Sequence, residues 1–233
     1  MADKKLKIKI LPKGPYELEE EIPVAQALIE PYPDGSSEKW GKGKTYENPK
    51  PGEPVHLCRC GHSKNKPFCD GTHNENGFEG EEVADHDGYK KRAQVYRGED
   101  LVLYDDEELC AVARFCDHAE GVWQLSIDSG DADNKERAVY MACACPSGRL
   151  TVTETDGTPI EPHLEPSVGV VEDLGQDCRG PLWVKGGIPI EGADGQTYEV
   201  RNRVTLCRCG ESGNMPFCDA SHLQCSHMKG TDK

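Results

Sequence analysis

Two short segments of this chain repeat one spacing of cysteine and histidine. In each, one residue separates the first two cysteines, eight residues precede the third cysteine, and three more precede a histidine. The residues are Cys58, Cys60, Cys69 and His73 in the first segment, and Cys207, Cys209, Cys218 and His222 in the second. Thiolates with one imidazole suit zinc or an iron-sulfur cluster, because both accept soft sulfur and borderline nitrogen donors. The repeated spacing therefore predicts two metal-binding sites.

The first cysteine pair of each set disfavours zinc. Structural zinc usually takes paired cysteines from C-x2-C to C-x4-C turns, whereas a single residue separates Cys58 from Cys60 and Cys207 from Cys209. Two zinc ions that staple small cores remain the structural alternative. Imidazole is neutral where thiolate is anionic, so one histidine ligand raises the reduction potential of a cluster and can be protonated near neutral pH. We therefore expect redox clusters that acid loosens.

The two ligand sets belong to two copies of a longer repeat, which must position them. Matching segments follow in the same order in both copies: 14–16 with 180–182, 22–24 with 188–190, 45–47 with 197–199, and 57–61 with 206–210. Weakly alternating, β-branched residues before the cysteines predict strands over 55–57, 198–200 and 204–206. The first copy contains an insertion over 30–44, whose Pro, Gly, Ser and Lys content predicts a surface loop.

The sequences CRCGHSKNKPFCDGTH and CRCGESGNMPFCDASH resemble the signature of the CDGSH iron-sulfur domain family, the mitoNEET-like proteins. The resemblance implies a [2Fe-2S] cluster in each copy, held by three cysteines and one histidine. Cys58 with Cys60 would hold the inner iron of the first cluster, and Cys69 with His73 the outer iron nearer solvent. The second copy would repeat this arrangement. The resemblance also implies that two such units pair by exchanging strands, so the two copies would form an intramolecular pseudo-dimer.

One position departs from the family pattern. The aspartate of the motif is followed by Gly71 in the first copy and by Ala220 in the second. Alanine is better than glycine in a helical turn, but it is strained at positive φ. We expect a helical turn at this position, with Asp70 and Asp219 as its N-caps.

The predicted fold is α+β and β-rich, and it has three parts. A CDGSH-type domain is expected over 1–78, an inserted small α+β domain over 92–165, and a second CDGSH-type domain over 178–227. The inserted segment resembles the divergent, ferredoxin-like segment that accompanies CDGSH motifs in some bacterial proteins. The resemblance is weaker there than in the two motifs.

The inserted segment contains four further cysteines, Cys110, Cys116, Cys143 and Cys145. Acidic residues at 105–108 precede an apolar pattern that predicts an amphipathic helix through the first two. Side chains six residues apart on a helix point about 120° away from each other, so Cys110 and Cys116 would not easily share a cluster. We expect buried thiols here, and a third metal site is the alternative. Cys178 and Cys225 are expected to be free thiols.

Composition argues against several classes of function. The 233 residues carry a net charge of -15 and no basic stripe, which opposes binding to nucleic acid. No segment approaches the run of roughly 18 apolar residues that crosses a bilayer, and the N-terminal segment has no apolar leader. No dinucleotide-binding glycine motif, P-loop or nucleophile-base pair stands out. We therefore expect a soluble, cytoplasmic protein that is not an enzyme and binds no membrane.

The expected function is electron transfer through two [2Fe-2S] clusters, in a monomer that forms an internal pseudo-dimer. A redox protein or an apo iron-sulfur acceptor protein would be its partner. Storage, sensing or transfer of clusters is the alternative function, and structural zinc binding is the third. Lys64 and Lys66 lie in the first motif, whereas Glu211 lies in the second. Because cations favour the more negative, reduced state, we expect the higher reduction potential at the N-terminal cluster.

Overall fold

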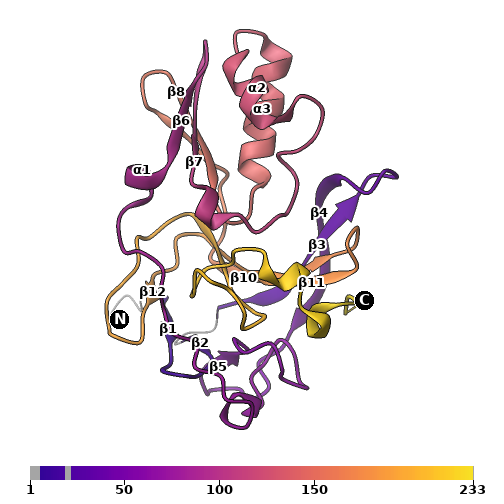
Figure 1. The fold of residues 1–233 in the computed structure, drawn as a ribbon, viewed down its shortest axis with the longest axis vertical. Coiled ribbons are helices and arrows are strands. Elements are labelled where there is room, and N and C mark those ends of the chain that lie inside the picture. The colour runs from indigo at the N-terminus through magenta and orange to yellow at the C-terminus, as the bar shows by residue number, and fades with distance from the viewer. Residues whose placement is uncertain (1–5, 19–21, 233) are drawn as a thin grey trace.

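The computed structural model describes residues 6–18 and 22–232 and contains three small β-sheets with few helices (Figure 1). The first five residues, on which the cytoplasmic expectation rests in part, lie outside the described ranges. The helices are α1 (Tyr89–Arg92), α2 (Gly121–Ile127) and α3 (Ala132–Ala144). None of the helices in the described ranges is long and apolar enough to cross a bilayer. The predicted β-rich α+β class is confirmed.

Two of the sheets have equivalent strand orders. The first sheet has the order β12-β1-β2-β5 and the second the order β13-β11-β10-β3-β4. The strands of the first are β1 (Ile8–Ile10), β2 (Tyr16–Leu18), β5 (Val55–Leu57) and β12 (Ile190–Glu191). Those of the second are β3 (Val24–Pro31), β4 (Ser37–Tyr46), β10 (Ser167–Asp173), β11 (Cys178–Lys185) and β13 (Arg203–Leu206). Only β4, the extra edge strand, breaks the equivalence.

Each copy of the repeat contributes one strand to the sheet of the other. β3, which follows the Ile-Pro pair of the first copy, pairs in parallel with β10, with Val24 opposite Val168. β12, which follows the Ile-Pro pair of the second copy, pairs in parallel with β1, with Ile190 opposite Ile8. The antiparallel pairs β2 with β5 and β11 with β13 complete the two halves. This reciprocal exchange confirms the predicted intramolecular pseudo-dimer.

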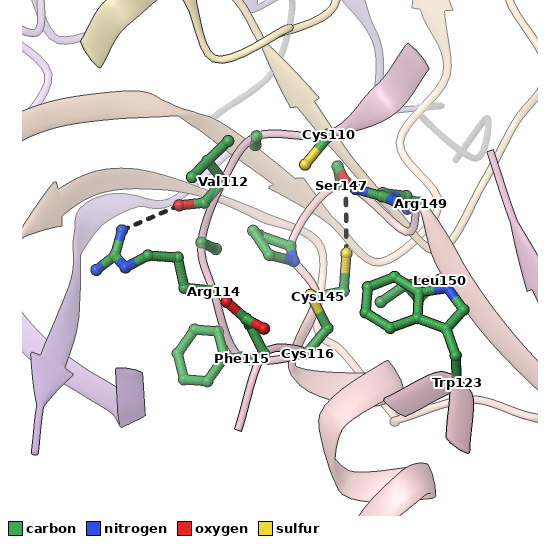
Figure 2. A pocket seen from close by; sticks show the side chains of 14 residues that line it. Cys110, Val112, Arg114, Phe115, Cys116, Trp123, Cys145, Ser147, Arg149 and Leu150 are labelled. Carbon is green, nitrogen blue, oxygen red and sulfur yellow. Dashed lines mark hydrogen bonds between the residues drawn. The ribbon is translucent and has the colours of Figure 1, made fainter. Parts of the chain in front are cut away.

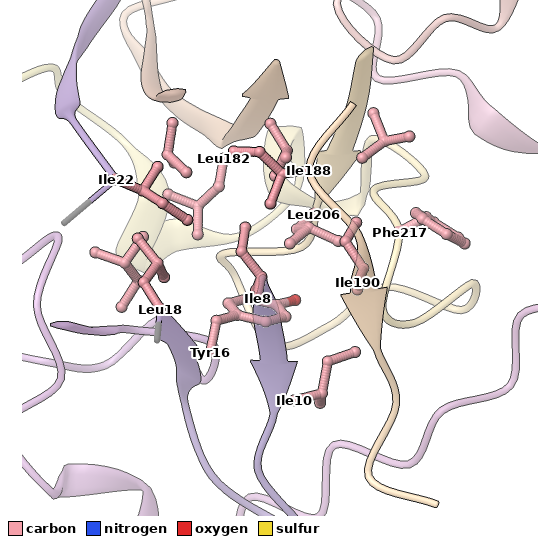
Figure 3. Close-up of a cluster of buried hydrophobic side chains, with 14 of the residues drawn as sticks. Ile8, Ile10, Tyr16, Leu18, Ile22, Leu182, Ile188, Ile190, Leu206 and Phe217 are labelled. Atoms are coloured by element: carbon pink, nitrogen blue, oxygen red, sulfur yellow. The ribbon is translucent and has the colours of Figure 1, made fainter. Parts of the chain in front are cut away.

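One apolar core joins the two halves (Figure 3). Its buried members come from both, among them Ile8, Tyr16 and Leu18 from the first, and Leu182, Ile188 and Leu206 from the second. The alternating burial of β1 and β2 directs these side chains to one face. The Tyr16 hydroxyl donates to the carbonyls of Cys207 at 2.8 Å and Pro216 at 3.2 Å. Each fully buried leucine or isoleucine side chain stabilises the fold by about 1.5–3 kcal/mol. The shared core therefore stabilises the pairing of the two halves.

The insertion over 30–44 is not a surface loop. It forms most of a long hairpin in which β3 and β4 pair antiparallel, with Ile29 opposite Trp40. The Trp40 ring packs against Trp183, with 4.5 Å between ring centroids, and its Nε1 donates to the Ala144 carbonyl at 2.9 Å. The loop prediction was wrong because these aromatic contacts outweigh the high Gly and Lys content of the strand.

The segment between the halves forms its own sheet and helix pair. The sheet has the order β6-β7-β8-β9, and α2 and α3 lie beside it (Figure 1). Its strands are β6 (Gln94–Arg97), β7 (Leu101–Asp105), β8 (Leu150–Glu154) and β9 (Pro159–Ile160). Asp131 caps α3 by accepting the amides of Asp133 at 3.0 Å and Asn134 at 3.1 Å. These elements fall within the predicted inserted segment, and the exact domain limits stay a prediction.

The predicted helix that starts at the acidic run is wrong. Only Glu107–Leu109 forms a single 3-10 turn, and an irregular loop follows it. Asp105 and Asp106 do not serve as helix-starting acids; they are buried and paired with Arg149 at 2.6 Å and Arg92 at 2.8 Å. Among the predicted strands, β5 and β13 confirm 55–57 and 204–206, whereas 198–200 is not a strand.

Candidate iron-sulfur sites

The eight predicted ligands lie in four pairs. In the first site, Cys58 Sγ is 3.8 Å from Cys60 Sγ, and Cys69 Sγ is 3.3 Å from His73 Nδ1. In the second site the corresponding distances are 3.6 Å and 3.4 Å. Two sulfur donors on one tetrahedral metal with bonds of about 2.3 Å are about 3.8 Å apart. In the described residues no three ligand side chains gather around one ion position, so the donors suit two metal ions per site.

The backbone positions the ligands in the same way in both copies. In the first, the Cys58 amide donates to the Pro67 carbonyl at 2.7 Å, and the Cys69 amide donates to the His56 carbonyl at 2.8 Å. In the second, the equivalent bonds measure 2.8 Å and 2.9 Å. The loop after β5 or β13 therefore closes back onto its own strand. This closure brings the third cysteine to the same side as the first two.

The position after the motif aspartate is left-handed, so the expected helical turn is wrong there. Gly71 has φ 91° and Ala220 has φ 72°, and each is the residue that caps the following 3-10 turn. Asp70 lies one residue before the cap and accepts the amides of Lys64 at 2.8 Å and Thr72 at 3.0 Å. These bonds lower the pKa of Asp70 to about 2. The aspartate is thus a loop clamp, and Ala220 bears strain that glycine avoids.

The two sites lie back to back across the pseudo-dimer interface. Gly61 and Gly210 follow the second cysteine of each motif and have φ values of 79° and 85°. A Cβ on Gly210 would lie 2.6 Å from the Cys60 carbonyl oxygen, and a Cβ on Gly61 would overlap the Cys209 carbonyl oxygen. Glycine is therefore required at both positions, because the inner cysteine of each site packs directly against the motif of the other.

The outer ligand pairs differ in exposure. Cys69 and His73 are half-buried, whereas Cys218 is 3% exposed and His222 is 4% exposed. Burial lowers the pKa of His222 to about 4, because the charged imidazolium loses its hydration. The C-terminal site is therefore enclosed, and the N-terminal site opens to solvent through its outer pair.

Two chain segments enclose the C-terminal site. Phe78, which follows the first motif, and Met228, in the tail after the second, both pack into one cluster with Cys207 and Cys209. The tail is held in place by an ion pair between Arg179 and Asp232 at 2.6 Å. Both extensions of the chain thus converge on the second site, which explains why equivalent ligands have different surroundings.

The arginine inside each C-R-C sequence is buried in a different way. Arg208 forms an ion pair with Glu172 at 3.1 Å, with both side chains at most 1% exposed. Arg59 is also buried, but its guanidinium lies over the rings of Tyr16 and Phe78 and donates to the Gly80 carbonyl. No carboxylate pairs with Arg59 in the described part of the chain. Among the described residues, one of these cations has a carboxylate partner and the other does not.

A third site candidate lies in the middle segment (Figure 2). A pocket of about 300 Å³ is lined by the thiols of Cys110, Cys116 and Cys145, with Trp123 and Arg149 on its wall. Burial raises the pKa of Cys116 to about 12, and the neighbouring thiol of Cys145 adds to the effect. Three soft donors around one hollow are a suitable ligand set for an iron-sulfur group.

The loop over 110–116 brings these thiols together. Cys110 and Cys116 do not point apart as they would on a helix, because this segment is an irregular loop. Val112 has φ 50° and Arg114 has φ 62°, values that are rare for residues with side chains and outlying for β-branched valine. Such backbone strain is characteristic of functional loops. The fourth cysteine, Cys143, does not line the pocket and instead lies 3.8 Å from the Ile160 carbonyl.

Sequence patterns alone did not bring out the roles of three residues around these sites. Cys145 is followed by Pro146, the pair that ends ferredoxin ligand motifs, and this signal favoured a cluster at the pocket. His227 is not an isolated histidine: its Nε2 lies 2.9 Å from the Cys209 carbonyl oxygen, and its ring packs at a tilt against His62, with 4.3 Å between ring centroids. No sequence spacing indicated that contact, since it depends on how the tail folds back.

The remaining two thiols lie beside the C-terminal site. Cys178 Sγ is 3.7 Å from the His222 carbonyl, and Cys225 Sγ is 3.3 Å from the Ser221 carbonyl. Both are free cysteines, and neither is part of a ligand pair described above. Cys178 is fully buried and helps to enclose the site.

Comparison with known families agrees with this division of the chain. Residues 13–74 and 179–223 match the family described as iron-binding zinc finger CDGSH type. Residues 96–155 match a second family, described as divergent 4Fe-4S mono-cluster. Both descriptions indicate an iron-sulfur cofactor. No curated protein and no solved structure gave a match. The chain therefore contains two segments of the CDGSH family, which flank a divergent 4Fe-4S segment.

Proposed function

We propose that each CDGSH segment holds a [2Fe-2S] cluster on three cysteines and one histidine, and that the protein carries single electrons. The arrangement of the donors in pairs is the observation that supports this most directly. A two-iron cluster takes one pair on each iron, whereas tetrahedral zinc needs all four donors around one ion. A redox protein that exchanges one electron at a time would be the partner.

We extend the proposal to a third iron-sulfur group in the middle pocket, held by Cys110, Cys116 and Cys145. The pocket volume of about 300 Å³, the three convergent thiols and the strained loop support it. Such a group supplies one-electron chemistry when it is bound. Three thiols leave one iron of a four-iron cluster to a ligand other than cysteine. The bidentate pair of Arg149 with Asp105, at 2.6 Å and 3.0 Å, would keep the pocket wall rigid.

A second candidate function is the donation of a cluster to an apo acceptor protein. One observation favours it: Cys69 and His73 are half-buried, so the outer iron of the N-terminal cluster would be open to incoming ligands. Proton uptake by a histidine ligand would release that iron. The enclosed C-terminal site lacks this access. Donation would therefore concern the N-terminal cluster.

The first test is the analysis of iron, zinc and sulfide in the purified protein, with its visible absorption spectrum. Two CDGSH clusters give about four iron and four sulfide atoms per chain, and a group in the middle pocket adds to both. The Cys145→Ser variant should lose the additional iron, and Cys143→Ser is the matched control that keeps it. A colourless protein with about two zinc ions per chain would contradict the redox proposal.

The second test separates the two functions. Reversible reduction without loss of colour, measured by voltammetry, is expected of an electron carrier. Transfer of iron and sulfide to an apo-ferredoxin is expected of a cluster donor. Under the second function His73→Cys should stop the transfer and His222→Cys should not, because only the first outer pair is accessible.

A further inference from the structure

The rim of the middle pocket is joined to the C-terminal CDGSH motif. Asn214, in the loop of that motif, donates from Nδ2 to the Glu108 carbonyl at 2.9 Å, two residues before Cys110. Leu109 and Phe217 belong to one core cluster and line the same small cavity. Each of them immediately precedes a thiol of interest, Cys110 or Cys218. The two thiols are therefore held on neighbouring, packed segments of backbone.

The N-terminal motif has no such connection to the pocket in the described structure. Asn65, which corresponds to Asn214, is exposed, and no hydrogen bond from its side-chain amide is seen. Phe68, which corresponds to Phe217, packs edge-on against Tyr46 of the hairpin at 6.0 Å. The contacts at the pocket therefore distinguish between the two motifs, although their ligands are alike.

The C-terminal site also touches the N-terminal site, on its other side. Gly210 packs on the carbonyl of Cys60, and Gly61 packs on that of Cys209. The order of contact is thus pocket, C-terminal site, N-terminal site. Of the two CDGSH sites, the second is the enclosed one, with His222 4% exposed, and the first opens to solvent.

We propose that the C-terminal CDGSH site is an internal electron relay between the middle pocket and the N-terminal site, and that the N-terminal site exchanges electrons with the partner. The inference rests on the proposed function, because it needs all three sites to hold iron-sulfur groups. One electron leaves the reduced group at the pocket, which is oxidised by one equivalent. That electron reduces one ferric ion of the C-terminal cluster, and it then passes on to reduce one ferric ion of the N-terminal cluster. An external one-electron reductant supplies the electron to the pocket group.

Electron paramagnetic resonance of the intact protein tests this order. The protein is reduced in steps with dithionite, and the microwave power that saturates each CDGSH signal is recorded. His73→Cys and His222→Cys, which exchange one ligand for another, identify the two signals. A paramagnetic group in the pocket should speed the spin relaxation of the C-terminal signal more than that of the N-terminal signal. Cys145→Ser and Cys116→Ser should remove this difference, whereas Cys143→Ser should keep it.

The outcomes separate the relay from the underlying function. Equal enhancement of both signals, or greater enhancement of the N-terminal one, would overturn the relay while all three groups are present. An unchanged iron content in both Cys145→Ser and Cys116→Ser would also overturn it, because the pocket would then hold no group. Either result would leave the proposal of two CDGSH clusters unaffected. Only a protein without iron would remove the function and the relay together.

Discussion

The two CDGSH sites have the same ligands on the same backbone frame and yet lie in different surroundings. Their donor distances agree within 0.2 Å, at 3.8 and 3.6 Å for the cysteine pairs and 3.3 and 3.4 Å for the outer pairs. Around them, Arg208 has a buried carboxylate partner, whereas no described carboxylate pairs with Arg59, and His222 is enclosed where His73 is half-buried. A short motif therefore determines what can bind, and the rest of the chain determines how accessible and how charged the site is.

The largest expected difference between the halves concerns the two buried arginines. Arg208→Met would leave Glu172 buried without its cation, and breaking a buried pair in this way costs about 3–5 kcal/mol of unfolding free energy. Arg59→Met removes a cation that has no acidic partner among the described residues, so it should cost only about 1–2 kcal/mol through lost ring and carbonyl contacts. Urea unfolding of the two matched variants measures both values.

Restoring neutrality provides the control for this comparison. The double variant Arg208→Met with Glu172→Gln removes both charges, and it should regain a large part of the stability lost in Arg208→Met. Equal destabilisation by the two single arginine variants would mean that the ion pair does not distinguish the halves.

The second largest effect should appear on acidification. Burial lowers the pKa of His222 from 6.5 to about 4. An imidazole buried in its neutral form contributes its full stability above pH 6.5 and loses it as pH falls towards 4, because the unfolded chain takes up the proton first. Because its histidine is enclosed and the N-terminal one is half-buried, the C-terminal cluster should keep its histidine to a lower pH than the N-terminal cluster.

Absorbance against pH in two ligand variants resolves this order. His73→Cys leaves His222 as the only histidine ligand, and His222→Cys leaves His73. Bleaching should need a lower pH in the first variant than in the second. The same midpoint in both, or the reverse order, would show that enclosure of the C-terminal site does not protect its ligand.

The sequence was sufficient for the features that depend on local spacing. The strands at 55–57 and 204–206 and the close approach of the candidate ligand side chains follow from the motifs and their repetition, and the strand exchange follows from the family resemblance. Features decided by distant contacts were not accessible. The hairpin over 30–44 depends on Trp40 packing against Trp183, and the acidic run at 105–108 is explained by arginines elsewhere in the chain. The three-thiol pocket was missed because the loop that forms it has an irregular backbone.

A smaller effect should distinguish the residues that follow the motif aspartates. Ala220 is held at φ 72° and Gly71 at φ 91°. A side chain in this left-handed region costs about 1–2 kcal/mol, and glycine avoids that cost. Ala220→Gly should therefore stabilise the apoprotein, offset in part by the greater freedom of glycine in the unfolded chain. Gly71→Ala should destabilise it by about 1 kcal/mol, since its nearest neighbour would lie 4.0 Å from the new Cβ. Thermal unfolding that moved in the same direction for both would contradict the strain argument.

The smallest effect concerns the charge of the motif loops. Lys66 is half-buried in the N-terminal motif, and the corresponding residue of the C-terminal motif is Met215, so Lys66→Met makes the loops alike without adding a new group. Because the lysine favours the reduced, more negative cluster, its loss should lower the N-terminal reduction potential. An interaction of about 0.5 kcal/mol corresponds to roughly 20 mV for one electron. Voltammetry should show the higher of the two CDGSH steps moving down while the lower CDGSH step stays in place. A shift of the lower step instead would assign the higher potential to the C-terminal cluster, and electrons would then not leave through the exposed site.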